Sequence, residues 1–224
     1  MGFAGHALDG ADRPSPRKLI GQVAPVSLAD QHLLPVLPEL RGLLPGGGLR
    51  RGTVVAVGGG PGSRSLTLAL LAAASAAGSW AAAVGVDDLG VVAAAELGVA
   101  LERFALVPQP GDVWPAVTAA LLDALDLVVV RPAGRVRPPD ARRLVARARE
   151  RGGVLLPIGE WPEAVDVRLT LCGAAWDGLG SGHGHLRARR LDITTGGRGA
   201  ASRERRVTVL LPAATPAPMS GGMP

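Results

Sequence analysis

The chain has 224 residues, of which 47% are hydrophobic and 19% are charged, and its net charge is +5. This composition favours a folded α/β protein over a disordered one, and the length suffices for one domain with a buried core. The single cysteine, Cys172, excludes an internal disulfide framework. We expect a cytoplasmic protein without a membrane anchor, because the N-terminus lacks the apolar core of a signal peptide.

Residues 1–43 are predicted to form an N-terminal segment outside the core. Residues 1–18 have a composition typical of disorder, and Ser27 with Asp30 three residues later predicts the start of a short helix. Pro35 and Pro38 then leave short apolar turns. These turns suit packing on a neighbour, which is either the core of this chain or another protein.

Between residues 44 and 158, apolar strands alternate with helices. The predicted strands are 53–57, 80–86, 103–108, 125–130 and 153–158. The predicted helices are 64–77, a helix from after Asp88 to about 97, 112–124 with Asp112 as its cap, and 138–152. Residues 66–86 have the length of a membrane span, but Gly78 and Ser79 divide them into a buried helix and a buried strand.

After residue 158 the hydrophobic period changes. Residues 166–171, 186–193 and 205–211 alternate polar and apolar side chains, as antiparallel strands with one solvated face do. The sequence therefore predicts one α/β domain over 44–211. We expect a mostly parallel, doubly wound sheet with helices on both faces and antiparallel strands at its C-terminal end. Residues 212–224 are predicted to be a disordered tail.

The segment "VVAVGGGPGSRSLTLALL" (54–71) resembles a phosphate-binding loop with its chemistry altered. Such a loop has the pattern G-x-x-x-x-G-K-[ST] between a strand and a helix. Gly58 and Ser65 occupy the first and last positions, but the second glycine is displaced to Gly62. Ser63 stands where glycine is expected, and Arg64 replaces the lysine. A Cβ at Ser63 crowds the backbone, and a guanidinium has a wider, planar geometry than an ammonium.

The strand 125–130 ends in Arg131, where an ATPase of this architecture needs an acid for Mg²⁺. A unit charge about 4 Å from a like charge is repelled by roughly 4 kcal/mol at an effective dielectric near 20. Asp126 lies at the opposite end of the strand. We therefore expect no catalysis, no metal and no cofactor. Arg64 and Arg131 either bind a nucleotide without metal or pair with a nearby carboxylate, and the pair is the favoured interpretation.

Three stretches resemble the RecA recombinase core: "GLRRGTVVAVGGGPGSRSLTL" (48–68), "AAELGVALERFALVPQPGD" (94–112) and "LRARRLDITTGG" (186–197). By this resemblance Asp87 falls at the position of the catalytic glutamate and Arg131 at that of the magnesium-binding aspartate. A RecA-like core with a degenerate ATP site is similar to the ImuA family, particularly its actinobacterial ImuA-prime form. The resemblance implies an adaptor that binds ImuB, a catalytically inactive Y-family polymerase relative. Such an adaptor supports an error-prone polymerase in mutagenic translesion synthesis during the DNA damage (SOS) response.

Basic residues concentrate near the C-terminus, where they form a candidate surface for a partner or for DNA. They are Arg187, Arg189, Arg190, Arg198, Arg203, Arg205 and Arg206. A compositional bias toward arginine is the competing explanation, because 23 of the 24 basic residues are arginine. The ImuA resemblance implies that the C-terminal region contacts ImuB, with weak DNA contact as a further possibility.

Two other function classes stay open. One is a working RecA-like ATPase that acts in recombination, and the other is a SulA-like inhibitor of cell division, which shares the RecA core without its ATP motifs. His183 and His185 with Cys172 do not complete a metal site. Trp161 and Trp176 are candidates for core packing or for interface anchors.

Overall fold

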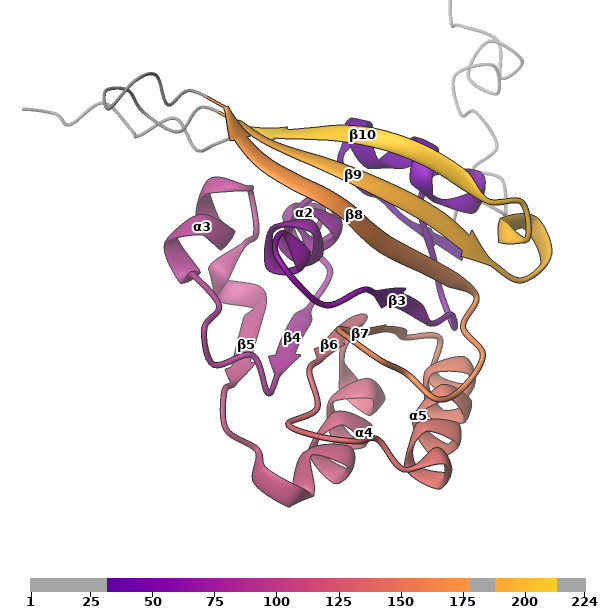
Figure 1. Ribbon diagram of the computed structural model, residues 1–224. Helices are drawn as coiled ribbons and strands as arrows, with labels where there is room; N and C mark the ends of the chain where they lie inside the picture. Colours follow the sequence, from indigo (N-terminus) through magenta and orange to yellow (C-terminus); the bar gives the residue numbers. More distant parts are fainter. Residues whose placement is uncertain (1–31, 178–187, 213–224) are drawn as a thin grey trace, which may run out of the picture. The chain divides into compact units, whose positions relative to one another are not determined.

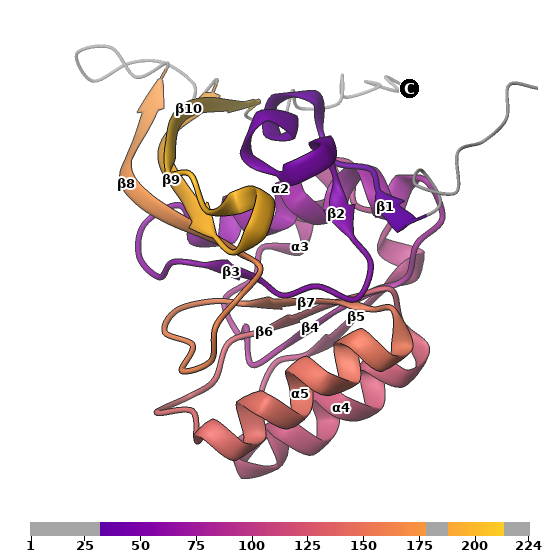
Figure 2. The same cartoon turned by 90° about the vertical axis from the view of Figure 1, so that its right-hand side faces the viewer.

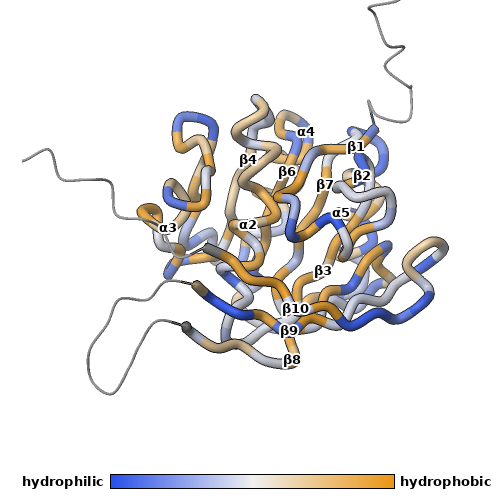
Figure 3. Tube along the Cα trace, turned by 90° about the horizontal axis from the view of Figure 1, so that it is seen from above, coloured by the Kyte–Doolittle hydropathy of each residue, from blue (hydrophilic) through white to orange (hydrophobic). Residues whose placement is uncertain are grey.

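The computed structural model describes residues 32–177 and 188–212. Its centre is a parallel sheet of four strands in the order β5-β4-β6-β7. These strands are β4 (Ala81–Val84), β5 (Phe104–Val107), β6 (Leu127–Val130) and β7 (Val154–Pro157). Each is apolar along its length, as Figure 3 shows for β6 and β7. This is the pattern of strands that are covered on both faces.

A second sheet of four strands has the order β10-β9-β8-β3. It contains β3 (Val55–Val57), β8 (Val167–Asp177), β9 (Ala188–Gly197) and β10 (Arg205–Pro212). β3 and β8 are parallel, whereas β8, β9 and β10 are antiparallel neighbours. Two parallel bridges, Val54 to Leu155 and Val57 to Ile158, join β3 to β7. The predicted order of parallel and then antiparallel strands is thus confirmed.

Helices cover both faces of the parallel sheet (Figure 1). α2 (Ser63–Ala76) and α3 (Val91–Glu96) lie on one face. α4 (Trp114–Ala124) and α5 (Pro138–Arg151) lie side by side on the other face (Figure 2). The α/β layering that the sequence predicts is therefore observed.

The pleat of β6 divides its side chains between two hydrophobic clusters. Leu127 and Val129 belong to the cluster that includes α2, and Val128 and Val130 belong to the cluster that includes α5. All four are essentially inaccessible to solvent. Successive side chains on a strand point to opposite faces, so an unbroken apolar run serves both layers.

Residues before the first core strand pack on this chain's own core. β1 (Leu33–Leu34) pairs with β2 (Leu49–Arg50), and a 3-10 helix spans Pro38–Leu43. Leu34, Leu40 and Leu43 belong to the cluster around α2. This resolves the docking of residues 33–43, which the sequence left open, while the helix predicted after Ser27 falls outside the described residues.

The predicted cap of the third helix is wrong. A 3-10 turn occupies Gly111–Val113, and α4 begins at Trp114 without a side-chain cap hydrogen bond. Pro115 stands in the first turn of α4, where its fixed φ favours a helix start. Asp112 is exposed instead.

The stretch of membrane-span length divides as predicted, into most of α2 and β4. Across residues 32–177 and 188–212, no helix has both the length and the hydropathy needed to cross a bilayer.

Candidate functional site

The loop between β3 and α2 is shaped by its contacts with β8 and β9. Gly58 N–H donates to the carbonyl of Leu169 on β8 at 2.7 Å. Gly62 precedes α2 with φ +95°, and a Cβ there would lie 2.7 Å from Leu191 Cδ2 on β9. The displaced glycine of the loop is therefore required by a left-handed backbone and by close packing on β9.

Ser63 and Ser65, the two serines of the phosphate-loop pattern, lie in the first turn of α2, and both hydroxyls bind other groups of the chain. Ser63 is buried, and its Oγ donates to the carbonyl of Gly60 at 2.9 Å. Ser65 Oγ accepts a hydrogen bond of 2.8 Å from Nη1 of Arg189, which comes from β9. The last position of the phosphate-loop pattern is thus hydrogen-bonded to an arginine distant in sequence.

Arg64 and Arg131 share one carboxylate. Arg64 Nη1 lies 2.7 Å from Asp88 Oδ2, and Arg131 Nη1 lies 3.1 Å from Asp88 Oδ1. The close approach of the chain after β4 to the end of β6 brings Asp88 there: a Cβ on Gly85 would lie 2.3 Å from the Arg131 carbonyl oxygen. The carboxylate pairing favoured from the sequence is observed, and its acid is Asp88 rather than the neighbouring Asp87.

A pocket of about 1180 Å³ opens beside this loop. It lies where β3, β6 and β7 end, the edge at which open α/β sheets bind ligands. Among the described residues, its lining contains five arginines and a single acid, Glu160. The arginines are Arg64, Arg131, Arg135, Arg168 and Arg189.

Arg189 is a partly buried cation of this lining. Its guanidinium stacks on Trp176, its cross-strand neighbour, at 4.8 Å from the ring centroid. Burial lowers the pKa of Arg189 below its usual range, and the nearby charge of Arg64 lowers it further. In the described parts of the chain, Arg189 has no carboxylate partner.

The C-terminal arginines do not form a single surface. Arg189 lines the pocket, whereas five others are exposed: Arg190, Arg198, Arg203, Arg205 and Arg206. Arg187 lies outside the described residues, as do His183 and His185. On β9, strand alternation separates Arg189 from Arg190, because successive side chains point to opposite faces of the sheet.

Several pocket residues are not evident from the sequence pattern. Arg135 and Arg168 come from segments without a recognisable motif, and Trp161 is 5% exposed rather than available as an interface anchor. One signal was present, since Glu160 and Trp161 directly follow a predicted buried strand. Residues in that position of a parallel sheet reach the ligand-binding edge.

Two comparisons relate the chain to other proteins. The family model described as MT3502 N-terminal domain matches residues 42–163, which include the loop, Asp88 and Arg131. Uncharacterized protein Rv3395c of Mycobacterium tuberculosis is 42% identical over 146 residues. That alignment covers 61% of this chain and 71% of the mycobacterial protein.

Proposed function

The chain belongs to the MT3502 N-terminal domain family, and from that premise we propose that it is a non-catalytic, RecA-like adaptor in the cytoplasm. Its partner is an ImuB-like, inactive relative of Y-family polymerases. The complex supports an error-prone polymerase in damage-induced, mutagenic translesion DNA synthesis.

The observation that carries the non-catalytic part is the ion pairing at the end of β6. Arg131 occupies the position that should hold a metal-binding acid, and Asp88 is engaged by both Arg131 and Arg64. A divalent cation would have to displace two guanidinium groups from that carboxylate and tolerate their charge. Asp126 offers no substitute, because it precedes β6 and bonds to Arg51 and to the Trp80 N–H.

The fold supports the RecA-like part of the proposal. A parallel sheet with helices on both faces is followed by antiparallel strands, which is the order expected from the RecA resemblance. The loop from β3 to α2 has the strand-loop-helix context of a phosphate loop, while its lysine and second glycine positions are altered.

The partner surface is assigned to the exposed arginines of β10 and of the turn before it. Arg205 and Arg206 are exposed, and Arg203 precedes them. This surface cannot be tested by removing β9 and β10, because Leu191, Ile193, Val209 and Leu211 on these strands are buried. Point substitutions leave that packing in place.

The test is a pull-down with the ImuB-like partner, using the full chain and an Arg205→Gln/Arg206→Gln variant. We expect the variant to bind about tenfold more weakly, because rim charges mainly set the rate and salt dependence of association. The matched control is Arg137→Gln/Arg142→Gln at the N-terminal end of α5, on the other side of the parallel sheet, with the same loss of charge. Equal binding of the two variants would contradict the assignment of the partner surface to β10. If the unaltered chain does not bind the partner, the proposed adaptor function is wrong.

Catalysis is tested separately by ATP turnover. We expect the rate with Mg²⁺ to equal the rate with EDTA, at the background of a protein-free reaction. Turnover that requires Mg²⁺ would favour a working RecA-like ATPase instead.

A further inference from the structure

We propose that the pocket at the ends of β3, β6 and β7 binds a small polyphosphate anion without a divalent metal. The site is lined by Arg64, Arg131, Arg135, Arg168 and Arg189. It is distinct from the exposed arginines of β10, and the inference does not rest on the proposed function.

The charge of the pocket is incompletely neutralised by the protein. Glu160 is the one acid that the described residues place in the lining, and Asp88 adds a second carboxylate that Arg64 and Arg131 share. Within the described residues, Arg135 and Arg168 have no carboxylate partner. Cations gathered in a concave site attract anions more strongly than the same charges spread over a surface.

Two buried polar groups of the lining also lack partners. Trp161 is 5% exposed, and its indole Nε1 has no hydrogen-bond partner among the described residues. Nε of Arg189 is likewise buried and without a partner in the same part of the chain. Buried donors are nearly always satisfied in folded proteins, so both groups call for an acceptor that the described residues do not supply.

The acceptor is a small molecule rather than a nucleic acid strand. The volume of about 1180 Å³ suits a ligand of nucleotide size. Trp161 packs in the hydrophobic cluster around α4 and α5, so it has no open face for base stacking. Guanidinium groups bind carboxylate and phosphate oxygens in pairs, and a polyphosphate suits several arginines better because it carries more negative charge than a carboxylate.

Asp88 competes with the ligand in this arrangement. Its carboxylate binds Arg64 and Arg131 from a position 46% exposed, so it can be displaced at little cost. A polyphosphate carries more charge than one carboxylate and can bind both guanidinium groups together with Arg189. Removing the Asp88 charge should therefore strengthen binding, whereas removing an arginine should weaken it.

The experiment is calorimetric titration of the full chain with inorganic tripolyphosphate and with ATP, each in EDTA and in Mg²⁺. We expect binding in EDTA, weakened by Arg189→Gln and by Arg168→Gln by about tenfold each, as for lost charge-assisted hydrogen bonds. Arg203→Gln, outside the pocket with the same charge loss, should change affinity by less than about twofold. Asp88→Asn should tighten binding by about threefold or more, and Asp112→Asn, with the same charge change, should not.

A second readout locates the ligand. The indole N–H resonance of Trp161, assigned with Trp161→Phe, should shift on addition of tripolyphosphate. The resonance of Trp80, which precedes β4 at the opposite end of the sheet, should stay in place. ATP should give the same shift, and a short single-stranded oligonucleotide should not compete at equal phosphate concentration.

Binding that requires Mg²⁺, equal losses in Arg168→Gln and Arg203→Gln, or an unmoved Trp161 signal would each overturn the proposal. Circular dichroism and urea unfolding verify that each variant is folded. If Arg189→Gln is not folded, Arg168→Gln and Asp88→Asn decide the outcome.

Discussion

At the scale of single residues, aspartates organise the arginines of this chain. Asp126 accepts a 2.7 Å hydrogen bond from Arg51 Nη1 and a 2.9 Å bond from the Trp80 N–H. It therefore joins the chain before β4 to the chain before β3. Asp88 has the equivalent role at the other end of the sheet, where it joins Arg64 to Arg131.

Asp126→Ala should destabilise the protein. Removing the carboxylate leaves the Trp80 N–H and the Arg51 guanidinium without this acceptor, at a cost of about 0.5–1.5 kcal/mol because both donors can turn to water. The free energy of unfolding in urea measures the change. Asp112→Ala is the control, because Asp112 is exposed and makes no cap hydrogen bond, and equal effects of the two would contradict the role of Asp126.

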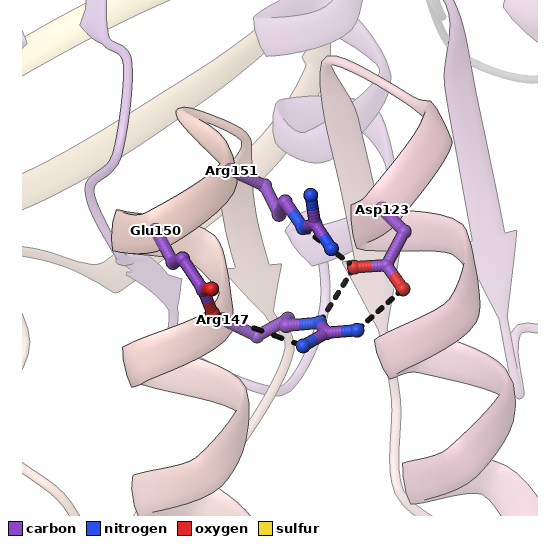
Figure 4. Close-up of polar contacts among 4 residues, drawn as sticks. All are labelled: Asp123, Arg147, Glu150 and Arg151. Atoms are coloured by element: carbon purple, nitrogen blue, oxygen red, sulfur yellow. Dashed lines mark hydrogen bonds and ion pairs between the residues drawn. The ribbon is translucent and has the colours of Figure 1, made fainter.

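Asp123 on α4 gives a prediction about pH (Figure 4). It binds Arg147 and Arg151 of α5, and the hydrogen bond from Arg147 is the main cause that lowers the pKa of its carboxyl. In the unfolded chain this carboxyl has a pKa near 3.8, and the folded-state pKa is lower. The ionised carboxylate therefore stabilises the fold at pH values above 3.8, and this contribution is lost as the pH falls through the folded-state pKa. The urea midpoints of wild type and Asp123→Asn should thus differ at neutral pH and become equal once the pH is below the folded-state pKa.

The same measurement in high salt tests whether the effect is electrostatic. The ion pairs of Asp123 with Arg147 and Arg151 lie at the surface, so salt should reduce the difference in urea midpoint at neutral pH. A difference that persists at acidic pH would assign the effect to the amide substitution itself rather than to the charge.

Single-residue chemistry was predictable from the sequence only in part. The sequence favoured a carboxylate partner for Arg64 and Arg131 over a nucleotide bound without metal. That the carboxylate is Asp88 and not Asp87 depends on the backbone after Gly85, which sequence spacing does not specify. Arg168 and Trp161 reach the pocket through the packing of the chain around β7 and β8, and no sequence motif predicts that packing.

At the scale of elements, the alternation of strands and helices was predictable because each parallel strand is an apolar run and each helix follows a turn. The ends of the elements were less so. Residues 125–130 read as one strand, but β6 begins at Leu127 because the N–H groups of Asp126 and Leu127 both bond to the Trp80 carbonyl. β8 extends to Asp177, past the predicted end at 171, because its partner β9 continues the ladder through a register shift near Gly173.

The start of α2 gives a prediction at this scale. Gly62→Ala places a Cβ 2.7 Å from Leu191 Cδ2 in a left-handed conformation, which should cost at least about 1–2 kcal/mol. Gly59→Ala is the control, since its Cβ would meet the Gly159 Cα at an ordinary 3.7 Å. Urea unfolding compares them, and a neutral Gly62→Ala would show that the loop does not depend on its contact with β9.

At the scale of the whole molecule, the antiparallel strands are part of the core rather than an appendage. Leu191 and Ile193 of β9 and Val209 of β10 are at most 1% exposed, and they share a cluster with α2. The sequence predicted these strands from their alternation, but alternation alone does not say what their apolar face covers.

A chain that ends before residue 187 should therefore lose cooperative unfolding and expose apolar surface. Removing β9 and β10 uncovers α2 and the inner face of β8, which the rest of the described chain does not cover. Urea unfolding followed by circular dichroism, together with ANS binding, measures the effect. A chain that ends after Pro212 retains both strands and is the control, and a cooperative transition in the shorter chain would contradict the assignment.

The bridges between β3 and β7 have a mechanical consequence. In the described residues the two four-stranded sheets are joined by backbone pairing at Val54 and Val57. Arg131 follows a strand of one sheet and Arg189 belongs to a strand of the other, so a ligand bound by both arginines would hold the two sheets together. The amide protons of Leu155 and Gly159, which donate from one sheet to the other, should exchange more slowly with solvent when the ligand is bound.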